Sequence, residues 1–151
     1  MHYLGEVLQN DILICSLISW AVAQGLKVPF MYLTDKKWNI KRFWGPGGMP
    51  SSHTALVVTL SIMIGSIHGF DTVEFAISSV FATVVMYDAA GVRRQTGTQA
   101  SVINEIVNRI FIEGEKITEK DLKEIVGHTP IEVFAGVLVG IAVSLIYLMF
   151  F

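Results

Sequence analysis

The sequence predicts an all-α integral membrane protein, a helical bundle with about four transmembrane helices and a cytoplasmic amphipathic helical insertion. Its 151 residues are 52% hydrophobic, and the mean hydropathy of +0.56 is above that of ordinary soluble domains. Four apolar segments are long enough, or nearly so, to cross a bilayer, which takes about 20 residues. The length fits one membrane-embedded domain, residues 1–151, with the insertion at about 95–127.

The four apolar segments cover residues 12–33, 54–67, 73–90 and 133–151. The second segment is short for a membrane span. Its shortness indicates that the preceding Pro-Ser-Ser-His stretch, residues 50–53, is buried in protein or opens to a polar cavity. Between the third and fourth segments, apolar residues recur at helical spacing over 102–111 with polar residues on the other face. We therefore expect an amphipathic helix on the membrane surface or under the bundle, followed by a short helix over 117–127.

Charge sets the expected orientation and excludes some partners. All 11 Lys and Arg residues lie late in the first segment or in the loops after the first and third segments, whereas the loop at 68–74 has none. By the positive-inside rule both long loops are cytoplasmic and both termini are outside. The net charge of −2 gives no reason to expect a nucleic-acid partner. Cys15, the only cysteine, excludes an intrachain disulfide and a multi-cysteine metal site.

Three polar stretches at segment ends should therefore meet at one membrane face. They are "GGMPSSH" before the second segment, "DAAGVRR" at the end of the third and "GHTPIEV" at the start of the fourth. Together they bring two histidines, two arginines and two carboxylates. Ionisable side chains at membrane depth are energetically costly, and where they occur they usually serve a function. This face is therefore the candidate site.

"GHTPIEVFAG" has two interpretations. Thr129, Pro130 and Glu132 form an N-cap, a first-turn proline and a capping box, which any helix could carry. The same cap leaves the Glu132 carboxylate able to accept a hydrogen bond from one ring nitrogen of His128. Glu132 would thereby fix the tautomer and orientation of the His128 ring and leave the other ring nitrogen as a nucleophile.

"PSSH" also has a structural and a functional interpretation. Ser51 or Ser52 could be the N-cap of a span, with His53 a polar residue at the interface. Alternatively, the free amides of this helix start, the serine hydroxyls and the glycine-rich approach at Gly48 form an anion cradle. His53 would then stand beside the cradle as a proton donor.

The remaining candidates are charged or polar residues near the same face. Arg93 and Arg94 could be membrane-end cations with Asp88 as their partner, and Lys27, with Gln24 one turn before it, could be a snorkelling lysine. Alternatively, Lys27, Arg93 and Arg94 bind an anionic substrate, supported by Asp88, Arg42 and Gln24. Asp88 could also hold a divalent cation.

Four blocks carry a resemblance to a known family: "SWAVAQGLK", "GGMPSSHTA", "VMYDAAGVRRQTGTQA" and "GHTPIEVFAG". With them the sequence resembles the type 2 phosphatidic acid phosphatases, relatives of the vanadium-dependent haloperoxidases, and most closely their divergent branch. The family's Pro-Ser-Gly-His motif is similar to residues 50–53, with Ser52 in place of glycine. Its final histidine and aspartate are similar to His128 and Glu132.

The resemblance has departures. The family's arginine, six residues before the final histidine, is matched by Leu122, so Arg93 or Arg94 would have to replace it. Its first motif, a lysine followed at seven residues by Arg-Pro, has no match, and the candidates are Lys27 or the pair at 41–42. Both differences concern positively charged residues that would bind the substrate and determine specificity.

The resemblance implies a membrane phosphatase that hydrolyses a lipid phosphate monoester, such as a polyprenyl phosphate or a phosphatidate. It implies His128 as nucleophile, a phosphohistidine intermediate, His53 as acid, and neither a metal nor a cofactor. The bilayer supplies the substrate, and four spans leave little surface to enclose a pocket, which favours a homodimer. The alternatives are a lipid-phosphate-binding protein without catalysis and a small transporter or channel subunit.

Overall fold

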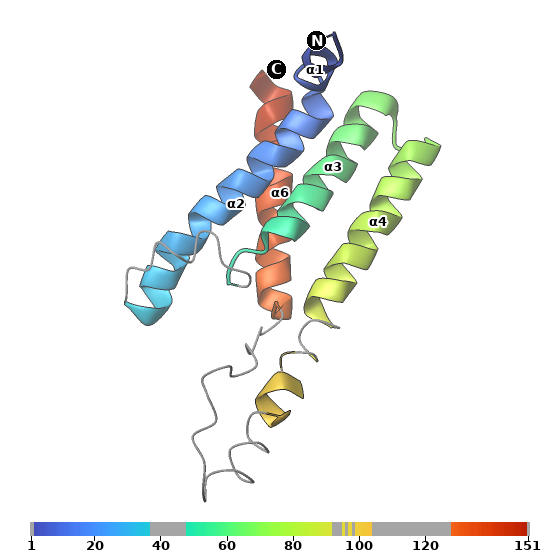
Figure 1. Ribbon diagram of the computed structural model, residues 1–151. Coiled ribbons are helices and arrows are strands. Elements are labelled where there is room, and N and C mark those ends of the chain that lie inside the picture. Colours follow the sequence, from blue (N-terminus) through green and yellow to red (C-terminus); the bar gives the residue numbers. More distant parts are fainter. Residues whose placement is uncertain are drawn as a thin grey trace, which may run out of the picture.

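The computed structural model describes residues 2–36, 48–91, 95, 97, 99–103 and 128–150. The helices labelled in Figure 1 are α1 (His2–Val7), α2 (Asp11–Asp35), α3 (Ser52–His68), α4 (Val73–Ala90) and α6 (Pro130–Phe150). The described part of the chain contains no strand. An all-α membrane bundle, as the sequence predicts, is therefore confirmed. Most of the predicted insertion lies outside the described residues. This includes the expected amphipathic helix from residue 104 onward and the whole of the expected short helix over 117–127.

The four long helices begin where the sequence provides an N-cap. A side-chain oxygen accepts a hydrogen bond from the amide three residues later, which replaces an intrahelical partner that the first turn lacks. The caps are Asn10 for α2, Ser51 for α3, Thr72 for α4 and Thr129 for α6. These local signals explain why the predicted segments agree with the helices to within a few residues. The short helix α1 was not among the expected elements.

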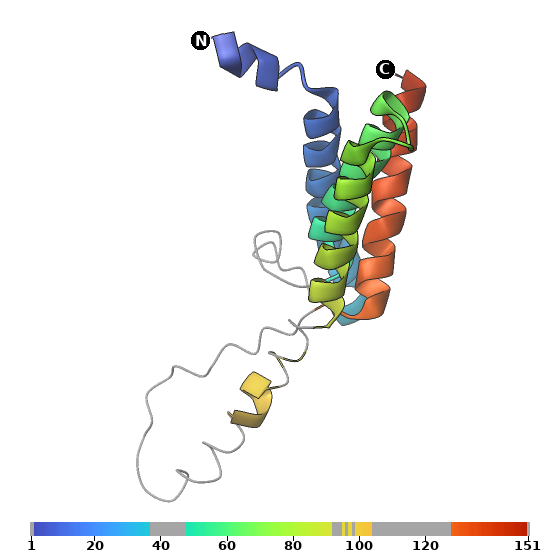
Figure 2. The same ribbon diagram turned by 90° about the vertical axis from the view of Figure 1, so that its right-hand side faces the viewer.

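The long helices run up and down, so that their ends gather in two groups. In Figure 1 the C-terminal ends of α2 and α4 lie at the same end of the bundle as the N-terminal ends of α3 and α6. The N- and C-termini of the chain lie at the opposite end, where α1 turns away from the bundle in Figure 2. The predicted convergence of the polar stretches at one end is therefore present for the parts that the structure describes.

Helix α3 is the centre of the bundle, and it packs against α2, α4 and α6. Two hydroxyls bind backbone carbonyls across these interfaces: Ser19 of α2 donates to Ala55 at 3.2 Å, and Thr59 of α3 donates to Gly140 at 3.1 Å. A methyl group added at Gly140 would lie 2.9 Å from the Ala55 carbonyl oxygen. The backbones of α3 and α6 are this close because a glycine separates them, as in membrane helix pairs.

The distribution of polarity is that of a membrane protein. The interior is rich in small and hydroxyl-bearing side chains, while large apolar side chains on α4 point outward: Ile77, Val80, Phe81 and Val84 are each more than half exposed. In water such a surface would be unstable, whereas in a bilayer it faces lipid. Three helices have the length and apolarity of a span, namely Asp11–Leu33, Val73–Ala90 and Pro130–Phe150. Helix α3, with 17 residues, is the shorter fourth apolar helix.

Candidate active site

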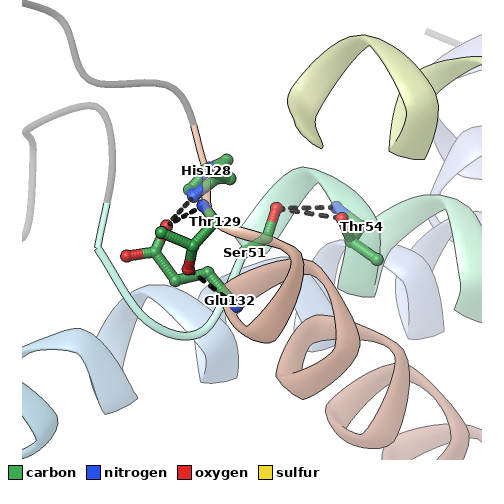
Figure 3. Close-up of polar contacts among 5 residues, drawn as sticks. All are labelled: Ser51, Thr54, His128, Thr129 and Glu132. Atoms are coloured by element: carbon green, nitrogen blue, oxygen red, sulfur yellow. Dashed lines mark hydrogen bonds and ion pairs between the residues drawn. The ribbon is translucent and has the colours of Figure 1, made fainter. Parts of the chain in front are cut away.

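The first turn of α6 holds a histidine and a glutamate in direct contact. The Nδ1 atom of His128 lies 2.9 Å from Oε2 of Glu132, and the same oxygen accepts a hydrogen bond from the Thr129 amide at 3.0 Å (Figure 3). The Thr129 hydroxyl in turn accepts the Glu132 amide at 3.4 Å. The predicted capping box and the predicted His128–Glu132 hydrogen bond are thus both present.

This arrangement decides which nitrogen of His128 is available for chemistry. A carboxylate only accepts hydrogen bonds, so Nδ1 carries the hydrogen and Nε2 keeps the lone pair of the neutral ring. The position of the ring is restricted, because His128 directly precedes the N-cap and the residue as a whole is only 6% exposed. A buried ring with one oriented nitrogen has the geometry that an activated nucleophile or base requires.

The second part of the site is the start of α3. Ser51 and Ser52 are fully buried, and Ser51 Oγ accepts hydrogen bonds from the Thr54 amide at 3.4 Å and from Thr54 Oγ1 at 2.9 Å (Figure 3). Gly48, just before them, has a φ of 87°, a conformation that glycine adopts without strain. By helix geometry the Ser52 and His53 amides have no carbonyl four residues earlier in the helix to bind.

A backbone hydrogen bond joins the two parts. The Ser51 amide donates to the Glu132 carbonyl oxygen at 3.0 Å. One turn further along α6, a methyl group added at Gly136 would lie 2.5 Å from the Ser51 carbonyl oxygen and 2.9 Å from Thr54 Cβ. The two motifs can touch only because residue 136 has no side chain.

The two helix starts give this end of the bundle a favourable field for anions. The N-termini of α3 and α6 are adjacent, and each is the positive end of a helix dipole. At α6 the Thr129 and Glu132 amides are already bound within the capping box, so the backbone donors for an anion lie mainly at the start of α3. A phosphate-sized anion between them would meet backbone and hydroxyl donors. The same field stabilises Glu132, which stands in the first turn of α6.

Helix α2 brings Lys27 and Gln24 to the same end. Because α2 and α3 are antiparallel and Ser19 contacts Ala55, the eight residues from Ser19 to Lys27 advance about 12 Å toward the start of α3. Ser51 lies about 6 Å from Ala55 in that direction. Lys27 is only 4% exposed, and Gln24 is also buried. Burial of this ammonium group among protein atoms does not fit a snorkelling lysine.

The other predicted site residues are distributed as follows. His53 is exposed in the first turn of α3, and Asp88 is half-buried in the last turn of α4. Arg42, Arg93 and Arg94 lie outside the described residues. Within the ranges that the structure describes, no group of three or more His, Cys, Asp or Glu side chains is arranged to hold a metal ion.

Two residues that the sequence prediction missed are Thr54 and Gly136. Thr54 follows the histidine of the Pro-Ser-Ser-His stretch and contacts Ser51 through its hydroxyl. Gly136, Gly140 and Ser144 recur every four residues along an apolar helix, and all three are buried. This spacing of small residues is a known signal of close helix packing in membranes, and it could have identified Gly136.

Comparison with known proteins decides the family. The model of the family described as "Divergent PAP2 family" matches residues 8–143, which include every part of the site described above. The chain belongs to the Divergent PAP2 family. The resemblance inferred from the four sequence blocks is thereby confirmed.

A relative supports the assignment of this Divergent PAP2 protein to membranes. The chain is 44% identical over 156 aligned positions to a protein of Bacillus subtilis strain 168 named "Uncharacterized membrane protein YuiD", covering 97% of this chain and 99% of the relative. The Divergent PAP2 chain is therefore a PAP2-like membrane protein. No solved structure matches it.

Proposed function

We propose that this protein hydrolyses the phosphate monoester of a lipid through a phosphohistidine formed on His128. The observation that carries the proposal is the hydrogen bond from His128 Nδ1 to Glu132 Oε2, in a buried ring at the junction of two helix starts. A carboxylate-oriented imidazole beside an anion-attracting cradle matches the needs of phosphoryl transfer. Such reactions need positioning and charge stabilisation from the protein.

In the first step, His128 Nε2 attacks phosphorus in line with the ester oxygen. The new N–P bond forms as the P–O bond to the lipid alkoxide breaks, and Glu132 stabilises the positive charge that develops on the ring. The non-bridging oxygens accept hydrogen bonds from the Ser52 amide and from the hydroxyls of Ser51 and Ser52, and they pair with the Lys27 ammonium. Arg93 and Arg94 are further candidates for this role, supported by Arg42, Gln24 and Asp88.

The proton for the leaving group comes from His53, in the first turn of α3. Its imidazolium gives a proton to the departing alkoxide, which leaves as the lipid alcohol. His53, now neutral, takes a proton from a water molecule whose oxygen attacks phosphorus and breaks the N–P bond, which restores the His53 imidazolium. Inorganic phosphate is released, and the neutral imidazole of His128 is restored.

A lipid substrate is supported by the place of the site in the bundle. The site lies at one end of helices whose outward surface is apolar. A phosphate headgroup could therefore reach His128 while its hydrocarbon tail remains in the bilayer. A polyprenyl phosphate and a phosphatidate present the same phosphomonoester, and the proposal covers both. On the positive-inside rule we place the site on the cytoplasmic side.

The experiment is a phosphate-release assay with purified full-length protein in detergent micelles. Polyprenyl phosphate, phosphatidate and a soluble phosphomonoester are offered to the wild type, to His128→Ala and to His68→Ala. His68 is the control because it is an exposed histidine in the last turn of α3, at the end of the bundle opposite to His128. We expect release from a lipid phosphate that His128→Ala abolishes and His68→Ala leaves unchanged.

A binding protein without catalysis is the second candidate, and Leu122 at the position of the family's arginine is the observation that favours it. In that case, lipid phosphate binds to the wild-type protein but no phosphate is released on any substrate. Binding that is equal in His128→Ala and wild type, with no release from either, would replace hydrolysis by this function.

A further inference from the structure

The hydroxyl group of Thr54 differs in what it binds from six other buried hydroxyls in the described helices. Six buried Ser and Thr hydroxyls donate to backbone carbonyl oxygens, which is usual inside helices: Ser16, Ser19, Thr59, Ser61, Ser78 and Ser144. Thr54 Oγ1 instead lies 2.9 Å from Ser51 Oγ. Either hydroxyl of such a pair can donate, and we assign Thr54 as the donor. Thr54 is also fully buried, so no water competes for this hydrogen bond.

The consequence falls on Ser51. A hydroxyl oxygen has two lone pairs and one hydrogen. One lone pair of Ser51 Oγ accepts the Thr54 amide as the N-cap of α3, and the other accepts the Thr54 hydroxyl. With both lone pairs occupied, Ser51 can take part in further hydrogen bonds only as a donor.

The place of Ser51 gives this donor a target. The Ser51 amide is bound to the Glu132 carbonyl oxygen, and Glu132 holds His128. The Ser51 hydroxyl therefore lies beside the turn that carries the proposed nucleophile. The unprotonated oxygens of a phosphoryl group accept hydrogen bonds and do not donate them, so a hydroxyl restricted to donation favours such an oxygen over water, which does both.

We infer that Thr54 is a positioning residue that fixes the Ser51 hydroxyl as a hydrogen-bond donor to a bound phosphoryl group. The inference rests on the proposed function for the identity of the anion. It adds a residue that neither touches the substrate nor belongs to the Pro-Ser-Ser-His stretch. Without the Thr54 hydroxyl, one Ser51 lone pair would be free, and the Ser51 hydrogen could turn away from the anion.

Thr54→Val with Thr59→Val as a matched control tests the inference. Both threonines are fully buried in α3, valine has nearly the same shape, and both variants lose one buried hydroxyl. The probe is orthovanadate, titrated calorimetrically into the purified full chain. Because the Ser51 hydroxyl can then turn its hydrogen away from the charged vanadate, we expect Thr54→Val to weaken vanadate binding about tenfold. Thr59→Val and the conservative Thr54→Ser should stay within about twofold of wild type.

A double-mutant cycle separates positioning from general destabilisation. If Thr54 acts through Ser51, Thr54→Val should have no further effect on vanadate binding in a Ser51→Ala background. Equal weakening by Thr54→Val in both backgrounds would overturn the inference, and so would an equal effect of Thr59→Val. Vanadate binding by a wild type that releases no phosphate would refute hydrolysis while the cycle still decides the role of Thr54. A wild type that binds no vanadate would overturn both proposals.

Discussion

The backbone amide of Ser51 donates a hydrogen bond to the carbonyl oxygen of Glu132, with an N–O distance of 3.0 Å. The hydrogen bond thereby fixes the start of α3 against the first turn of α6, although the two residues are far apart in the sequence. This contact brings the start of α3 next to the start of α6, the two parts of the candidate site (Figure 3). What holds the contact in place, and what it allows chemically, can each be tested.

The first prediction concerns Gly136. A methyl group there would collide with the Ser51 carbonyl oxygen and Thr54, so Gly136→Ala should move α6 away from α3. Overpacking of this kind costs about 1–3 kcal/mol. We expect a lower midpoint of thermal unfolding in detergent and reduced phosphate release. Gly25→Ala is the control, because a methyl group at Gly25 meets no atom within 4 Å, and it should change neither property. An unchanged Gly136→Ala variant would show that this close approach is not needed.

The second prediction separates the two roles of Glu132. In Glu132→Gln an amide oxygen can still accept the Thr129 amide, so the helix cap survives, but the charge that orients and stabilises the His128 ring is lost. Hydrogen bonds to charged groups are worth about 1.5–3 kcal/mol, so the turnover rate should fall about 10- to 100-fold with little change in thermal stability. Glu132→Ala should lose both turnover and thermal stability. Wild-type turnover in Glu132→Gln would remove Glu132 from the mechanism.

The third prediction assigns separate roles to the histidines. A general acid matters in proportion to how much the leaving group needs a proton, and typically contributes about 10²- to 10⁴-fold. His53→Ala should therefore be severely impaired on a lipid phosphate and recover much of that loss on p-nitrophenyl phosphate, whose leaving group needs little protonation. His128→Ala should be inactive on both substrates. A recovery by His128→Ala, with none by His53→Ala, would mean that the two roles are reversed.

The fourth prediction concerns the side of the membrane on which the site lies. Lys36 and Asp71 are exposed residues at opposite ends of the bundle. In a Cys15→Ala background, Asp71→Cys should react with an impermeant thiol reagent in intact cells, whereas Lys36→Cys should react only after the cells are opened. The reverse labelling would place the site on the outer face and contradict the positive-inside argument.

The parts of this structure that the sequence predicted are those specified by residues a few positions apart. The N-cap of α6, its capping box and the His128–Glu132 pair involve residues within four positions of one another, so the spacing alone was sufficient. The starts of α2 and α4 agree for the same reason, since a cap directly precedes each apolar run.

The register between helices could not be predicted in this way. The contact of Ser51 with Glu132 depends on how closely α3 and α6 approach, which is set by Gly136 and Gly140 and not by the polar motifs. Thr54 was missed for a different reason. The sequence does not give the hydrogen-bond partner of a threonine hydroxyl, and only the three-dimensional arrangement reveals that the partner of Thr54 is Ser51.

A phosphohistidine on His128 can be detected directly by capturing the phosphorylated protein. Purified wild type is mixed with a lipid phosphate that it hydrolyses, quenched in alkali within one turnover, digested and analysed by mass spectrometry. Phosphohistidine survives alkali and is lost in acid, which distinguishes it from a phosphoserine at Ser51 or Ser52. We expect an acid-labile phosphoryl group on His128 that is absent in His128→Ala and present in His68→Ala. Phosphate release with no phosphoryl group on His128, or with the group on His53, would contradict it.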